Sequence, residues 1–197
     1  MMESKKTLFS TRDLVIIGLF SALAYVLMLL ESPGYLGFLR IEFSDVPAIL
    51  GGLGISPAAG VFIELIKNII KAMSTKTVGA GELANFVVGS AYVLPLSIIY
   101  KKWKGKHRLL VGYVVGTVAM CIAGMIVNYF ITLPLYSSMF GGVDALVGYV
   151  GSMTPGFLPE INSLWKIIII GITPFNVVKG IMMAIGTLMV KKPTMLL

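Results

Sequence analysis

The stretch that decides the fold is Ile167-Ile168-Ile169-Ile170-Gly171-Ile172-Thr173-Pro174-Phe175-Asn176-Val177-Val178-Lys179-Gly180, which continues as apolar sequence to Val190. Its length suits a helix that crosses a bilayer, since such a helix needs about 20 predominantly apolar residues. Lys179 is the only charged side chain in this run. An ammonium group in hydrocarbon costs roughly 3 kcal/mol or more, so Lys179 predicts a partner, a cavity or a ligand.

The composition of the whole chain agrees with this segment. Hydrophobic residues make up 57% of the 197 residues and charged residues only 13%, and the mean hydropathy is +0.92. These values lie outside the range of soluble domains and predict an all-α, polytopic membrane protein surrounded by lipid. With one cysteine, Cys121, and one histidine, His107, a His/Cys metal cluster is excluded. The net charge of +7 would suit nucleic acid, but the basic residues form short blocks between apolar runs, as in cytoplasmic loops.

Apolar windows bounded by turn residues predict six transmembrane helices in a single domain, residues 1–197. The expected ranges are about 12–30, 45–55, 57–73, 82–100, 109–137 and 161–190. The second helix is short, because about eleven residues at a rise of 1.5 Å cover half of a ~30 Å hydrocarbon core. Ser44 or Asp45 is expected to cap it, and Gly51, Gly52 and Gly54 lower its helix propensity. Such a helix must be buried in the bundle or line a cavity.

Six spans place both termini on one side of the membrane. The basic residues on that side are Lys5, Lys6, Arg12, the block from Lys101 to Arg108, Lys191 and Lys192. Basic residues mark the cytoplasmic face, so we expect a multi-pass plasma-membrane protein with both termini inside and its first apolar run retained as a span. Lys67, Lys71 and Lys76 fall toward the outside, where basic residues suit a site better than topology.

Four polar side chains in the predicted helices are candidates for a shared site: Asn68, Asn85, Asn128 and Lys179. Two purely structural explanations remain open. Glu64 has Lys67 and Asn68 as neighbours on its own helix face, and Asn128 could make an interhelical hydrogen bond worth under about 1 kcal/mol. A convergent polar cluster accounts for all four side chains together, because polar groups inside a membrane usually face a bundle interior or a cavity.

The chemistry of this cluster suits an aromatic heterocycle better than an inorganic ion. Each amide offers a donor and an acceptor together, and a lysine donates to carbonyl or hydroxyl groups. Flat apolar surface beside those amides can come from five aromatic residues: Tyr129, Phe130, Phe86, Phe43 and Tyr136.

No energy source is encoded in the chain. Its one Gly-Lys pair, Gly105-Lys106, is followed by His107 instead of Ser or Thr, so it is not a nucleotide-binding loop. Active uptake would therefore need partner ATPase subunits. Gly18, Ser21 and Ala22 in the first helix form a small-residue face that allows close packing, either against a partner or within the chain.

Five segments in order give the chain a family resemblance over nearly its whole length. They are Phe38-Leu39-Arg40-Ile41-Glu42-Phe43-Ser44-Asp45-Val46-Pro47, Pro57-Ala58-Ala59-Gly60 running into Lys67-Asn68, Ala84-Asn85-Phe86, Asn128-Tyr129-Phe130 with Leu133-Pro134-Leu135-Tyr136, and Pro174-Phe175-Asn176 with Lys179-Gly180. With these segments the chain resembles the riboflavin-specific substrate-binding (S) components of energy-coupling factor (ECF) transporters.

The resemblance implies a six-helix S-component fold with an outward-facing riboflavin pocket under the loop from Glu31 to Ser44. The residues expected to bind substrate are Asn128, Lys179, Asn85, Asn68, Asp45, Phe43 and Tyr129. The resemblance also implies a membrane coupling subunit and two ATPase subunits as partners, with Gly18, Ser21 and Ala22 as the docking face. No cofactor is expected besides the transported vitamin.

Three other functions compete with this interpretation. One is an intramembrane enzyme with Glu64 or Asp45 as acid/base and Lys179 as an electrostatic stabiliser, although nothing in the sequence pairs a nucleophile with a base. Another is an S component for a different vitamin or a purine, because a fold does not choose its ligand. The third is a structural membrane subunit, which would leave the polar cluster unexplained.

Overall fold

The computed structural model describes residues 8–75 and 79–190, and within these residues every regular element is a helix. In chain order the elements are α1 (Thr11–Leu29), α2 (Asp45–Gly54), α3 (Pro57–Ala72), α4 (Ala80–Lys102), α5 (Arg108–Val127), η1 (Asn128–Thr132), α6 (Leu133–Phe140), α7 (Val143–Ser152), α8 (Leu164–Lys166), η2 (Ile167–Ile172) and α9 (Thr173–Val190). The two η elements are π-helical turns. The described part contains no strand, only one isolated bridge between Tyr35 and Leu39. Lys5, Lys6, Lys76, Lys191 and Lys192, used above to assign topology, lie outside the described residues.

Within the described residues, four continuous helical stretches are long and apolar enough to cross a membrane. They are Thr11–Leu29, Ala80–Lys102, Arg108–Phe140 and Leu164–Val190. Helices α2 and α3 have 10 and 16 residues, which at 1.5 Å per residue reach about 15 and 24 Å across a ~30 Å core. The prediction of six transmembrane helices is therefore not confirmed by helix length, although helices form at all six predicted positions.

Local sequence signals explain where several helices begin. Ser10 and Asp13 form a capping box at the start of α1. Ser56 accepts a hydrogen bond from the Ala59 N–H at 3.1 Å, and Pro57 occupies the first position of α3, where a missing N–H costs nothing. Ser44 occupies the position before α2, as predicted for a cap, but its side chain makes no hydrogen bond to the backbone of that helix. Its hydroxyl instead accepts a hydrogen bond from Lys67 at 2.7 Å.

Two helices that the sequence predicted as regular are interrupted by π-helical turns, η1 and η2. Each turn lies just before a proline, Pro134 or Pro174. Proline lacks an N–H, so the helix interior around it loses a hydrogen bond. Each turn also carries a side-chain hydrogen bond: the Thr132 hydroxyl donates to the Val127 carbonyl at 3.5 Å and the Thr173 hydroxyl to the Ile168 carbonyl at 2.9 Å. Such turns are often found at functional sites, and both lie beside the cavity described below.

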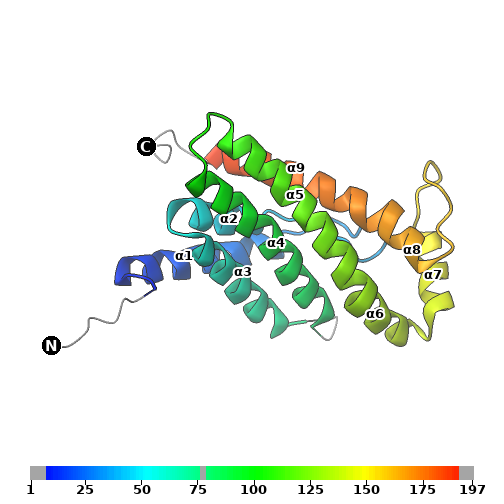
Figure 1. Cartoon of the computed structure of the whole chain (residues 1–197). Coiled ribbons are helices and arrows are strands. Elements are labelled where there is room, and N and C mark those ends of the chain that lie inside the picture. The colour runs from blue at the N-terminus through cyan, green and yellow to red at the C-terminus, as the bar shows by residue number, and fades with distance from the viewer. Residues whose placement is uncertain (1–7, 76–78, 191–197) are drawn as a thin grey trace.

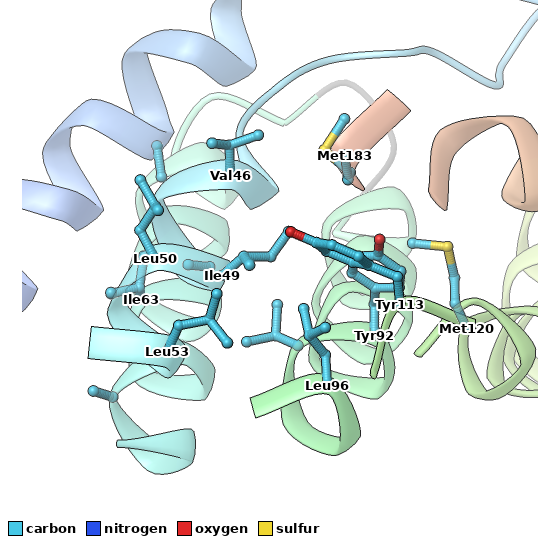
Figure 2. Close-up of a cluster of buried hydrophobic side chains, with 14 of the residues drawn as sticks. Val46, Ile49, Leu50, Leu53, Ile63, Tyr92, Leu96, Tyr113, Met120 and Met183 are labelled. Atoms are coloured by element: carbon cyan, nitrogen blue, oxygen red, sulfur yellow. The ribbon is translucent and has the colours of Figure 1, made fainter. Parts of the chain in front are cut away.

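The main apolar core joins helices that are distant in sequence. Figure 2 shows Tyr92 and Tyr113, from α4 and α5, among aliphatic side chains of α2 and α3 and Met183 of α9. The Tyr92 hydroxyl donates to the Gly180 carbonyl at 2.8 Å, which ties α4 to α9 next to Lys179. These contacts hold α9 at one position along α4 and thereby place Lys179 in the bundle.

A second apolar cluster covers the other end of the bundle, where α6, α7 and η2 meet. The sequence analysis predicted no helix over α7. Leu146 and Val150, four residues apart on one face of α7, are both fully buried. That spacing is the helical signal, but ten residues are too few to stand out as a membrane span.

Candidate functional site

A cavity of about 340 Å³ lies among α3, α4, α9, the η1–α6 region and the loop that precedes α2. The volume is at the lower end of the range for small-molecule sites. Polar side chains in its wall include Glu42, Lys71, Asn85, Asn128, Asn176 and Lys179. Phe38, Tyr136 and Phe175 contribute aromatic surface. The wall thus combines apolar area with a few polar groups, as ligand sites do.

Lys179 of α9 lies in this wall and is only 4% exposed. Its Nζ is 3.0 Å from Asp45 Oδ2 and 3.8 Å from Glu42 Oε1, and it donates to Asn85 Oδ1 at 3.1 Å. Of the three explanations for a lysine in an apolar helix, the structure therefore supplies two, carboxylate partners and a cavity.

A chain of buried charges continues behind Lys179. Asp45 uses its other oxygen, Oδ1, to pair with Lys67 of α3, and Lys67 is 2.9 Å from Glu64 Oε2. Asp45, Glu64 and Lys67 are all fully buried. The structural explanation of Glu64 and Lys67 as a pair within α3 is thus confirmed. Alternating signs let each charge be compensated where water cannot solvate it.

The predicted amide cluster forms, with unequal access to the cavity. The Asn85 amide group donates to Glu42 Oε1 at 3.2 Å and to Asn68 Oδ1 at 3.3 Å, while its oxygen accepts from Lys179. Asn128 donates to the Gly124 carbonyl at 2.8 Å within its own helix, and its side chain lines the cavity. Asn68 is not part of the wall and contacts it through Asn85.

Three other residues predicted for the site lie away from the cavity wall. Asp45 supports Lys179 from behind. Phe43 is 41% exposed and packs near Gly186 of α9. Tyr129 stacks on Trp165, with 4.5 Å between ring centroids. Tyr136, which was also expected to supply aromatic surface, does line the cavity, whereas Phe38 and Phe175 were not predicted to do so.

Several polar residues of the wall were not predicted for the site, and Asn176 and Glu42 are the two with a buried unpaired atom. Asn176 lies three residues before Lys179, so helical spacing places both on one face of α9, and this signal was available. Glu42 lies in the loop before α2, where no periodicity predicts the direction of a side chain. Among the described residues, Asn176 Nδ2 and Glu42 Oε2 are both buried without a hydrogen-bond partner.

The loop from Glu31 to Ser44 covers one side of the cavity. Arg40 pairs with Glu31 at 2.9 Å, and the Ser32 N–H donates to the Ile41 carbonyl at 2.9 Å, so the two ends of the loop are held together. Leu36 at its tip is 2% exposed and packs against Gly171, where a side chain would collide with it. The loop is thus anchored on η2 and contributes to the wall of the cavity.

The predicted docking residues on α1 face two directions. Gly18 and Ala22 are exposed, and no atom lies within 4 Å of the position of a Cβ on Gly18. Ser21 is 1% exposed and donates to the Ile17 carbonyl at 2.7 Å. Of the three predicted docking residues, only Gly18 and Ala22 therefore lie on the outer face of α1.

A bundle of apolar helices around a partly enclosed, polar and aromatic cavity defines a membrane protein that binds a small molecule. The described residues hold no group of three His, Cys, Asp or Glu side chains that could bind a metal. Residues 12–190 match the family model for the substrate-specific component of ECF transporters. The chain belongs to this family, so it is a multi-pass membrane protein and a transport component, and the enzyme alternative is set aside.

Individual relatives agree with the family model. The chain is 36% identical to the riboflavin transporter FmnP of Bacillus subtilis (strain 168) over 179 residues, which cover 88% of this chain and 87% of that protein. It is 33% identical to the riboflavin transporter RibU of Staphylococcus aureus (strain TCH60), over 92% of this chain and 89% of that protein. A solved S component of a bacterial ECF transporter superposes with a TM-score of 0.70 at 30% identity, covering 91% of this chain and 92% of that structure.

Proposed function

We propose that this chain is the riboflavin-binding subunit of an ECF transporter, which captures the vitamin outside the cell and delivers it inward when docked to an ATP-driven module. The observation that carries the proposal is the convergence of Asn85, Asn128, Asn176 and Lys179 in one cavity that also has aromatic walls. Relatives over nearly the whole chain are named riboflavin transporters, and the amide and ammonium groups match the carbonyl and imide edge of a flavin.

In this proposal riboflavin is bound by Lys179 and Asn128 directly. Riboflavin is uncharged, so Lys179 orients it by donating hydrogen bonds to flavin oxygens, while its charge stays balanced by Asp45. Asn85 and Asn68 act mainly by holding Lys179 and Glu42 in position. Phe43 and Tyr129 join the ligand only if the loop and η1 shift when it binds.

The proposed topology has six spans and both termini in the cytoplasm. Helices α2 and α3 complete the set although they are short, because the other helices shield their backbone from lipid. The partners are a membrane coupling subunit, which meets α1 at Gly18 and Ala22, and two ATPases. Close helix approach at small residues supports this docking face.

The test is to titrate riboflavin into detergent-purified protein and record flavin fluorescence. Lys179→Met and Asn128→Ala should each weaken binding about tenfold or more, the size of a lost hydrogen bond in a site of this kind. Lys102→Met, which removes an exposed lysine at the end of α4, is the matched control and should bind as the wild type does. Unchanged affinity in both site variants, or a wild-type protein that binds no flavin, would contradict the proposal.

A further inference from the structure

The end of α4 and its short connection to α5 concentrate positive charge at one end of the bundle (Figure 1). This basic loop reads Lys101-Lys102-Trp103-Lys104-Gly105-Lys106-His107-Arg108. The sequence has no acidic residue between Glu82 and Asp144. Within the described residues, no ion pair involves a cation of the basic loop. Its lysines and its arginine are therefore not neutralised by carboxylates in the described part of the chain.

Two cations of the basic loop are held against the protein. Lys101 Nζ donates to the Ile55 carbonyl, at the end of α2, at 3.0 Å. The guanidinium carbon of Arg108 lies 4.3 Å from the centre of the Tyr100 ring, which is a cation–π contact. The other three cations are exposed and make no side-chain hydrogen bond within the described residues: Lys102, Lys104 and Lys106. These three ammonium groups are free to bind an anion.

The basic loop borders the part of the surface that faces lipid. Leu110 and Val114, four residues apart in the first turns of α5, are 62% and 56% exposed. In a multi-pass membrane protein such side chains contact the lipid tails, which are as apolar as leucine. Trp103 is 50% exposed, and tryptophan is enriched at the level of the lipid headgroups. The three free lysines are therefore placed where the phosphate groups of the lipids lie.

We infer that the basic loop binds the headgroups of anionic phospholipids, with its three free lysines on the phosphates and Trp103 at the boundary with the acyl chains. Each lysine beside an anionic membrane surface contributes a preference of roughly fivefold. An acidic protein partner fits the position less well, because the docking face proposed on α1 lies apart from this loop (Figure 1). The lipid site is separate from the riboflavin cavity, whose wall contains no residue of the loop.

Trp103 is the reporter in the experiment that tests this site. The chain has two tryptophans, so Trp165→Phe leaves Trp103 as the single one, and every protein compared carries this change. The proteins are reconstituted into phosphatidylcholine vesicles, in which a rising fraction of the lipid is replaced by brominated phosphatidylcholine or by brominated phosphatidylglycerol. Bromine quenches tryptophan fluorescence only at short range. The two quenching curves therefore measure the preference for anionic lipid beside Trp103.

With the basic loop intact, we expect phosphatidylglycerol to be preferred about fivefold or more over phosphatidylcholine at low salt. The triple variant Lys102→Gln/Lys104→Gln/Lys106→Gln should bring the two quenching curves close together. High salt should do the same to the intact loop, because it screens exposed charges. The control Arg12→Gln/Lys166→Gln removes two cations outside the loop and should keep the preference.

Equal quenching by the two lipids with the intact loop would overturn the inference and leave a protein partner as the occupant. It would also be overturned if the triple variant kept the preference, or if the control variant lost it as well. If the triple variant cannot be reconstituted, the single change Lys104→Gln and the salt series carry the same comparison, and no change in either is the contrary result. Riboflavin titration tests the proposed function separately, because the basic loop does not line the cavity.

Discussion

Helices α1 and α2 follow one another in the chain and are both strongly apolar, yet they have opposite environments. Only Ile17, Ser21, Ala24 and Met28 of the 19 residues of α1 are buried. Nine of the ten residues of α2 are buried, including Asp45. Figure 1 shows the first turns of α1 projecting beyond the other helices, while α2 lies within the bundle. Hydropathy therefore reports that a segment avoids water, but not whether lipid or protein surrounds it.

Glycines mark the difference, because the glycine that α3 packs against α2 is crowded and the glycine of α1 is not. Gly60 of α3 lies so close to α2 that a Cβ there would be 2.8 Å from the Ala48 carbonyl oxygen. Gly18 of α1 has no atom within 4 Å of the same position. The missing side chain of Gly60 lets α3 pack closely against α2 inside the protein. The missing side chain of Gly18 instead leaves space on the outer face of α1, where a partner helix could approach closely.

The largest effect is expected when the charge of Asp45 at the start of α2 is removed. Asp45→Asn leaves Lys67 and Lys179 buried with one fewer counter-charge, and breaking a buried ion pair from one side costs about 3–5 kcal/mol. Thermal unfolding in detergent should show a large fall in the midpoint or little folded protein. Glu31→Gln, which breaks the exposed pair with Arg40, is the control and should cost about 1 kcal/mol or less. Equal midpoints for the two variants would show that α2 does not depend on its buried charge.

A smaller loss is expected from Gly60→Ala. The added methyl group would approach the Ala48 carbonyl oxygen and Val93 Cγ1, at 2.8 and 2.5 Å, so α2 and α3 must move apart. Overpacking of this kind costs about 1–3 kcal/mol. The same unfolding experiment measures it, with riboflavin binding as a second readout. A midpoint at or above that of the wild type would mean that the α2–α3 contact is looser than the structure indicates.

The smallest effect on stability is expected from Gly18→Ala on α1. No neighbouring atom obstructs the new methyl group, and alanine favours a helix over glycine by up to about 1 kcal/mol, so unfolding should be unchanged or slightly delayed. Gly18→Leu should also fold and bind riboflavin normally. If the outer face docks the coupling subunit, Gly18→Leu should reduce uptake in cells that carry the complete transporter. Normal uptake by Gly18→Leu would remove Gly18 from the docking face.

The positions of the helices were predictable wherever the local sequence alone indicates a helix. The helices begin within about two or three residues of the predicted positions because hydropathy, caps and prolines act locally. The π-helical turns and α7 were not predicted. A π turn differs from an α turn only in which backbone carbonyl each N–H bonds, so hydropathy does not distinguish the two. The apolar face of α7 is short, and it is buried only because α6 and η2 pack against it.

The site was predictable in kind but not in detail. Asn85, Asn128 and Lys179 were predicted to converge, and all three line the cavity. Asn68 and Asp45 lie one contact behind the wall, because the residues between them and the cavity, Asn85 and Lys179, reach it first. Nothing along the chain distinguishes a residue that lines a cavity from one that supports the wall.

The sequence by itself determined that this is a helical membrane protein with costly polar groups in its spans, because the cost of placing a residue in lipid depends mainly on that residue and its neighbours. Only the tertiary structure decided how those groups are paired. Lys67 and Asp45 are 22 positions apart, and Lys179 and Asn85 are 94 apart. Contacts over such separations depend on how α2, α3, α4 and α9 pack, and no local sequence pattern specifies that packing.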